Sequence, residues 1–141
     1  MREIKYRGIC IETDEWFYGD LLKNEHETYI VDDFESSNDY GDGYDVYATN
    51  FKKVHQKTVG EHTGVVDKNG KDIYEGDIVR ITSNIRDDYN ALITFFNGGF
   101  CAIDGTEGNH SLRIYRLSNS ELEIEVIGNI HENPELLEAK E

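Results

Sequence analysis

The chain has 141 residues, of which 38% are hydrophobic and 11% aromatic, which suits one domain or two small subdomains that share a core. Its formal net charge of −15 argues against direct binding to DNA, RNA or an anionic membrane, because such binding depends on basic side chains that meet phosphates. The first residues lack the apolar stretch of a signal peptide, and no run approaches the ~20 apolar residues of a membrane span, so we expect a cytoplasmic protein.

The N-terminal part of the sequence predicts a β-hairpin followed by one more short strand. Ile4 and Tyr6 alternate with charged residues up to Gly8, and a polar turn over Glu12–Glu15 leads into the aromatic run that starts at Trp16. Alternation of this kind on both sides of a polar turn is typical of a hairpin. Thr28–Val31 is the next predicted strand.

The segment Asp32–Asp45 reads DDFESSNDYGDGYD and shows no hydrophobic period. Acids, Ser, Asn and Gly without periodicity indicate irregular backbone. We therefore predict a long loop here. After it, Val46–Ala48 is predicted to return to the sheet as a strand, and Asn50–Gln56 could instead hold a helical turn.

The middle of the chain contains the sharpest turn of the sequence, Asp67-Lys68-Asn69-Gly70, between two short β-branched segments. Asp bonds its own backbone at the start of such turns and Asn-Gly supplies positive φ, so a hairpin is predicted. Gly60 and Gly64, which precede the turn, each allow a bulge or a close backbone approach. A second turn at Tyr74–Asp77, whose Asp is expected to cap local backbone amides, leads into a strand at Ile78–Ile81.

The last third predicts a hairpin, two further strands and a terminal helix. Asn97-Gly98-Gly99 is the hairpin turn, and Asn133-Pro134-Glu135 has the residues of a helix start, with Leu136 and Leu137 as its apolar anchors. The predicted strands are Ala91–Phe96, Phe100–Ile103, Leu112–Leu117 and Glu121–Ile130.

These elements predict a mainly β fold of antiparallel strands. We expect the C-terminal half to be a small SH3-like barrel or a curled sheet, followed by a short C-terminal helix. The predicted division is an N-terminal hairpin region with the acidic loop, residues 1–57, and a barrel-like region with the helix, residues 58–141.

Three segments stand out in order along the chain: EWFYGDL at residues 15–21, VGEHTGVVDKNGKDIYEGDIV at 59–79 and EVIGNIHENPELL at 125–137. Together they resemble the YopX family, small proteins encoded by bacteriophages and prophages, and the resemblance covers nearly the whole chain. His62 and His131 stand where the family would have an aromatic residue. The resemblance implies a phage origin and a mixed, mostly β fold; it implies no catalytic residues.

Negative charge is concentrated in one part of the sequence. Twelve acids and one base lie between Glu12 and Asp45 and account for eleven of the fifteen net negative charges. A solvated face with a flexible loop is one interpretation, and divalent-cation binding is another. The functional interpretation is an acidic surface that binds a basic host protein, with the interleaved Phe34, Tyr40, Tyr44 and Tyr47 as aromatic anchors. Its candidate residues are Asp32, Asp33, Phe34, Glu35, Asp39, Tyr40 and Tyr44.

No residue spacing in the sequence indicates catalysis or a cofactor. There is no phosphate-binding loop, no nucleophile elbow and no His-x-x-x-His, and Cys10 and Cys101 stand far apart without Cys-x-x-Cys spacing. We therefore expect a non-enzymatic, protein-binding protein without metal or cofactor. The alternatives are a metal-dependent enzyme acting on nucleic acid, or a protein that mainly assembles with its own copies through exposed strand edges.

Overall fold

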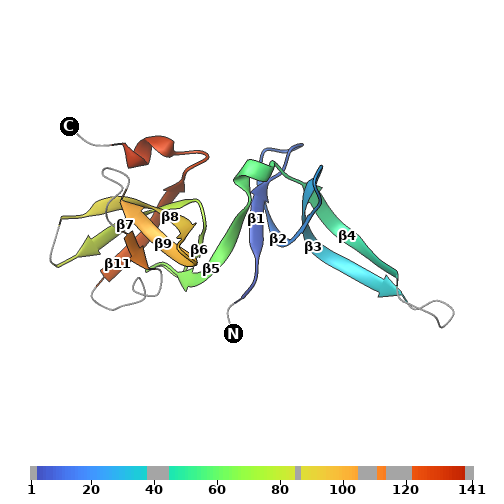
Figure 1. The fold of residues 1–141 in the computed structure, drawn as a ribbon, viewed down its shortest axis with the longest axis horizontal. Helices are drawn as coiled ribbons and strands as arrows, with labels where there is room; N and C mark the ends of the chain where they lie inside the picture. Colours follow the sequence, from blue (N-terminus) through green and yellow to red (C-terminus); the bar gives the residue numbers. More distant parts are fainter. Residues whose placement is uncertain (1–2, 38–44, 85–86, 105–110, 114–121, 139–141) are drawn as a thin grey trace. The chain divides into compact units, whose positions relative to one another are not determined.

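The computed structural model describes residues 3–37, 45–84, 87–104, 111–113 and 122–138. The chain forms two compact units, one over Ile4–Glu61 and the other from His62 onward together with residues 1–3. Both units are made of antiparallel β-strands (Figure 1), so the predicted mainly β fold is confirmed. Each unit is described by itself below.

The first unit is an antiparallel sheet in which neighbours in sequence are neighbours in space. Its strands lie in the order β4-β3-β2-β1, and β1 also pairs with the start of β5 through Gly60 and Glu61. A 3-10 turn, η1, precedes β5. The elements are β1 (Tyr6–Ile9), β2 (Trp16–Lys23), β3 (Thr28–Ser37), β4 (Asp45–Lys53), η1 (Gln56–Thr58) and β5 (Gly60–Val66).

The base of this sheet is closed by contacts between the ends of β1 and β4. Cys10 and Val54 form an isolated bridge, and the amide of Ile11 donates to the carbonyl of Lys53 over 3.0 Å. Gly8 lies so near that a Cβ on it would be 2.9 Å from Val54. Cys10 and Val54 are both buried, so the end of β4 at Lys53 is fixed to β1 as well as to β3.

Strand β2 accompanies β3 for only part of its length. The two strands pair from Lys23↔Thr28 to Asp20↔Val31, while the earlier residues of β2 pair with β1. Gly19 lies against β3 at the point of departure, since a Cβ there would be 2.7 Å from the carbonyl carbon of Val31. Beyond Val31, within the described residues, β3 pairs with β4 alone.

The predicted long loop at Asp32–Asp45 is wrong for much of its length. β3 continues to Ser37, and β4 begins at Asp45 and runs straight to Lys53, through part of the segment for which a helical turn was considered. Residues 32–36 are exposed on both faces, and a strand exposed on both faces has no alternation of apolar and polar residues by which to recognise it.

The second unit contains a five-stranded sheet in the order β10-β9-β8-β7-β11. The later part of β5 also pairs with β6, with an irregularity around Gly64, which has φ 88°. The predicted hairpin turn is confirmed at Asn97 and Gly98, which both have positive φ, and β9 begins at Gly99. The elements are β6 (Asp72–Tyr74), β7 (Asp77–Ser83), β8 (Tyr89–Phe96), β9 (Gly99–Asp104), β10 (Ser111–Arg113), β11 (Leu122–Asn129) and the 3-10 turn η3 (Pro134–Leu137).

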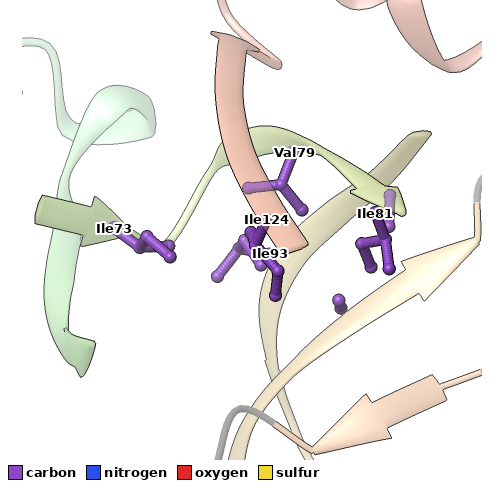
Figure 2. Close-up of a cluster of buried hydrophobic side chains, with 7 residues drawn as sticks. Ile73, Val79, Ile81, Ile93 and Ile124 are labelled. Carbon is purple, nitrogen blue, oxygen red and sulfur yellow. The ribbon is translucent and has the colours of Figure 1, made fainter. Parts of the chain in front are cut away.

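The core of the second unit is a cluster of almost completely buried apolar side chains, most of them β-branched. Figure 2 shows five of them, which come from β6, β7, β8 and β11. Leu122 and Val126 pack against the cluster from β11, on the same face as Ile124, as their alternation with acids predicts. The labelled residues are Ile73, Val79, Ile81, Ile93 and Ile124.

Two parts of the fold prediction for this half are wrong. The described strands form an open sheet with β10 and β11 as its edges, instead of a closed barrel. The predicted C-terminal helix is a four-residue 3-10 turn in which the amide of Leu136 donates to the carbonyl of Asn133. Asn133 does not cap it, because its side chain accepts from the amide of Asn129 instead.

A buried carboxylate, Asp67, holds the hairpin turn between β5 and β6 against β11. Its Oδ1 accepts hydrogen bonds from the amides of Asn69 and Lys71 over 2.8 and 2.9 Å, and its Oδ2 accepts one from the amide of Val126 over 3.0 Å. Burial raises the pKa of Asp67, but the hydrogen bonds from these amides lower it by more. The carboxylate is therefore stabilised in its charged form.

Gly19→Ala tests the departure of β2 from β3. The added methyl group would collide with the backbone of Val31, and we expect a loss of about 1–3 kcal/mol of stability. Thermal unfolding followed by the fluorescence of Trp16, the single tryptophan, measures it. In Gly99→Ala the methyl would meet only the flexible end of Arg113, and near wild-type melting by circular dichroism is expected. A Gly19 variant as stable as wild type would contradict this account.

Asp67→Asn tests the buried carboxylate. We expect it to lower the free energy of unfolding by about 1–3 kcal/mol at pH 7, because an amide group cannot accept all three hydrogen bonds. The folded-state pKa is lowered, so the contribution of the charge is complete above the unfolded value of about 3.9 and is lost as the pH falls through the folded value. The difference from wild type in urea unfolding should therefore shrink toward acid pH.

The control for this experiment is Asp88→Asn, which removes an exposed ion pair with Arg80. A change of at most about 1 kcal/mol is expected there. If the difference between wild type and Asp67→Asn stays constant from pH 7 to acid pH, the charge on Asp67 is not what stabilises the turn.

Candidate interaction surface

The part of the first unit that extends past β2 is a two-stranded ribbon formed by β3 and β4, here called the β3–β4 ribbon and consisting of Asp32–Ser37 and Asp45–Asn50 (Figure 1). The register is irregular at Asp33, which pairs with Asn50, and is regular again at Phe34↔Ala48. Between the pairs Val31↔Phe51 and Phe34↔Ala48, each strand contains two residues. Neither strand therefore has an extra residue, and side chains that lie opposite each other stay on the same face along the ribbon.

One face of the ribbon combines aromatic rings with carboxylates. Tyr47 lies opposite Glu35 and its hydroxyl donates to Glu35 Oε2 over 3.0 Å. Toward the base, the rings of Phe51 and Tyr29 pack edge to face with centroids 5.8 Å apart. Tyr47 and Phe51 are 50% and 47% exposed, so this face presents apolar area that no described residue covers.

The other face carries two large apolar side chains. Phe34 lies opposite Ala48 and is 56% exposed, and Val46 lies opposite Ser36 and is 64% exposed. Exposed rings and branched side chains on both faces of one ribbon have no role in the core of this unit. Such groups are the usual anchors of protein interfaces.

Charge is distributed unevenly along the two strands. The carboxylates of Asp32, Asp33, Glu35 and Asp45 lie on the ribbon, and the described part of the ribbon holds no basic side chain. Asp32 Oδ2 accepts a hydrogen bond from the side chain of Asn50 over 3.0 Å. The two lysines of β4, Lys52 and Lys53, follow at the base of the ribbon. There, Lys53 Nζ lies 3.7 Å from Glu27 Oε1.

The structure places four of the seven predicted site residues on β3, all of them exposed. They divide between the faces, with Asp32 and Phe34 on one and Asp33 and Glu35 on the other. The remaining three, Asp39, Tyr40 and Tyr44, lie outside the described residues.

Two exposed residues of the surface, Val46 and Phe51, are not among the predicted ones. The sequence predicts a strand only at Val46–Ala48, which lies within β4. The run DVYATNFKK alternates apolar and polar residues only in part, so the full length of β4 and its place beside β3 are not apparent from the sequence.

His62 is a buried histidine that lies beside a carboxylate, Asp72. Its Nδ1 accepts from the amide of Gly64 over 2.9 Å, which places the proton on Nε2. Nε2 lies 3.1 Å from Asp72 Oδ1, although not in hydrogen-bond geometry, and the ring packs edge to face on Tyr74. These contacts hold the irregular part of β5, so His62 has a structural role.

The described residues contain no group of three or more His, Cys, Asp or Glu side chains placed to hold a metal ion. Both cysteines are free and buried, and burial raises the pKa of Cys101. Across the described ranges there is no helix with the length and hydrophobicity that a membrane crossing requires.

Comparison with known proteins identifies the family. The sequence profile of the YopX family, described as YopX protein, matches residues 5–138. The fold is similar to the crystal structure of protein EF1440 from Enterococcus faecalis, with a TM-score of 0.63, 24% identity and coverage of 98% of this chain and 100% of that one. It is also similar to the crystal structure of protein yopX from Bacillus subtilis, with a TM-score of 0.54, 18% identity and full coverage of both chains.

No curated protein matches the chain. The family match covers nearly the whole sequence and bears out the resemblance of its three segments, and the two solved structures share its fold. The chain therefore belongs to the YopX family.

Proposed function

We propose that this protein is a non-enzymatic accessory protein of a phage or prophage that binds a basic protein in the cytoplasm of the bacterial host. The β3–β4 ribbon is its binding surface. The observation that carries the proposal is the mixture, on one exposed ribbon, of four carboxylates with the large apolar side chains of Phe34, Val46 and Tyr47.

The two kinds of side chain would contribute differently to binding. Carboxylates on a projecting surface attract a basic partner and raise the association rate. Aromatic side chains bury a large area at a small cost in conformational entropy, so they supply most of the affinity. Tyr47 is already oriented by its hydrogen bond to Glu35, which reduces the ordering cost on binding.

The arrangement of the carboxylates supports binding more than catalysis. Asp32 is hydrogen-bonded by a neutral amide and Glu35 by a phenol, and both side chains are exposed. Catalytic carboxylates are usually placed together in a cleft that shifts their pKa values. On the ribbon the charges are instead spread over two faces, as suits contact with an extended basic surface.

The combined substitution Asp32→Asn, Asp33→Asn and Glu35→Gln tests the proposal. In a pull-down from bacterial lysate, wild type is expected to retain a basic protein at low salt and less of it at moderate salt, because screening weakens attraction between exposed charges. The neutralised variant should retain at least about tenfold less, which corresponds to a loss of roughly 1.4 kcal/mol.

A control with the same change in net charge separates this surface from charge in general. Asp87→Asn, Glu123→Gln and Glu135→Gln remove three exposed carboxylates of the second unit, and retention of the partner should be close to wild type. Equal loss in both variants, or equal retention by wild type and the ribbon variant, would refute the proposed surface.

A further inference from the structure

The β3–β4 ribbon lacks a third strand. Past Val31, β2 no longer pairs with β3, and within the described residues the two strands pair only with each other. Two-stranded ribbons are marginally stable in water, and sheets become stable with three or more strands. A strand added to one edge of the ribbon would form hydrogen bonds with the outward backbone groups of that edge.

The other long edge strand of the described sheets is already protected. On β11, the amide of Val126 donates to Asp67 and the carbonyl of Ile124 accepts from the amide of Lys68 over 2.9 Å. The edge strands β6 and β10 have three residues each. Among the described residues, the outer edge of β4 is covered at Lys53 alone, by Ile11, and 3-10 turn η1 follows beyond it.

We propose that β4 pairs antiparallel with β4 of a second copy of this chain, about a twofold axis at Thr49. In this register Thr49 lies opposite Thr49 of the partner subunit. Tyr47 of each copy lies opposite Phe51 of the other, and Ala48 lies opposite Asn50. The sequence of β4, DVYATNFKK, complements itself about its central Thr when it is reversed.

The charges on the two strands favour antiparallel over parallel pairing, and the edge of β4 over the edge of β3. In the antiparallel register, Asp45 of one copy lies at the end of the ladder beside Lys52 and Lys53 of the other, so opposite charges meet at both ends. A parallel pair would place the acids together and the lysines together, which destabilises a sheet. The outer edge of β3 carries Asp32, Asp33 and Glu35 without a base, so pairing there would bring like charges together.

The length of the ladder follows from the contact at the base of the sheet. The carbonyl of Lys53 already accepts from Ile11, so the partner strand cannot lie beside Lys53, and the ladder runs from Tyr47 to Phe51. Asp45 then lies beyond the last pair of the ladder, within reach of the long lysine side chains of the other copy. The result is a four-stranded sheet with the order β3-β4-β4-β3.

The gain in packing comes from the aromatic face. Tyr47 and Phe51, each about half exposed in the single chain, become cross-strand pairs at two symmetric positions. Aromatic pairs directly opposite each other stabilise antiparallel strands. Tyr29, already packed on Phe51, extends the row of rings on each side.

This inference goes beyond the proposed function and does not depend on it. Self-pairing uses the outer edge of β4 and leaves the acidic side chains of β3 exposed at both sides of the four-stranded sheet. The variant with Asp32, Asp33 and Glu35 neutralised should therefore associate with itself at least as well as wild type, even where it loses a basic partner.

Disulfide formation tests the register. At a twofold axis the two copies of Thr49 have Cα atoms about 4.5–5.5 Å apart, within the range that a disulfide spans. Thr49→Cys should give a covalent dimer under mild oxidation, since both native cysteines are buried. In the control Val46→Cys, residue 46 lies opposite Lys52 of the partner, about 20 Å from its own copy, and should remain monomeric on a reducing-agent-free gel.

Reversing the charges on β4 tests whether β4 pairs with β4 of a second copy and whether the two strands are antiparallel. The dissociation constant of the dimer is measured by sedimentation. Asp45→Lys alone, and Lys52→Asp with Lys53→Asp, should each weaken the dimer by about tenfold or more, because like charges then meet at both ends. The combination of all three should restore association to near the wild-type level. Unchanged melting temperatures show that the variants are folded.

Three results would overturn the inference. One is a wild-type chain that sediments as a monomer up to about 1 mM, the weakest association worth considering. Another is a combined charge variant no tighter than the partial ones. The third is a Thr49→Cys chain that is oxidised to dimer no faster than Val46→Cys, which would indicate random collision instead of a twofold register.

Discussion

The constraint on which the first unit depends is the place where β2 leaves β3. At Gly19 the backbone of β2 lies so close to Val31 that a side chain would not fit, and past this point β3 continues with β4 alone. Ile30 and Val31, before this point, are buried, and the residues after it are exposed. One close backbone contact thus separates the part of the strand that builds the core from the part available to other molecules.

In the second unit, by contrast, the edge strand β11 is protected by a side chain. Asp67 forms the turn of its own hairpin and also accepts a hydrogen bond from β11, so a single carboxylate fixes a local turn and protects an edge of the sheet. Burying this charge is favourable because three backbone amides replace its water. The core cluster of Figure 2 includes Ile124 of β11, the strand whose edge is protected in this way.

The parts of the fold that the sequence predicted are those determined by local chemistry. Asp67–Gly70 and Asn97-Gly98 are turns because their residues adopt positive φ or bond their own backbone, and Ile124 faces the core because its neighbours alternate with it. Whether the sheet stays open or closes into a barrel depends on contacts between strands that are distant in the sequence, and local residue patterns do not show these contacts. The helix prediction at Pro134 was wrong because Asn133 bonds to Asn129, a competition that composition does not show.

The candidate surface was only partly predictable for a related reason. Charge and aromatic content identify Asp32, Asp33, Phe34 and Glu35, yet the sequence predicts a loop there because neither face of the ribbon is buried. Val46 and Phe51 could be added only after the pairing of β4 with β3 placed them beside these residues. Exposure on two faces is what removes the periodic signal and also what makes the ribbon suited to binding.

The separation of acids from lysines along β3 and β4 gives this part of the molecule an electric dipole. Its negative end lies over the ribbon, at Asp33, Glu35 and Asp45, and its positive end lies at Lys52 and Lys53. The field of a charged molecule that approaches through water exerts a torque on this dipole before any surfaces touch. The protein would therefore turn its ribbon toward an approaching basic partner, so a larger share of collisions would begin in a productive alignment.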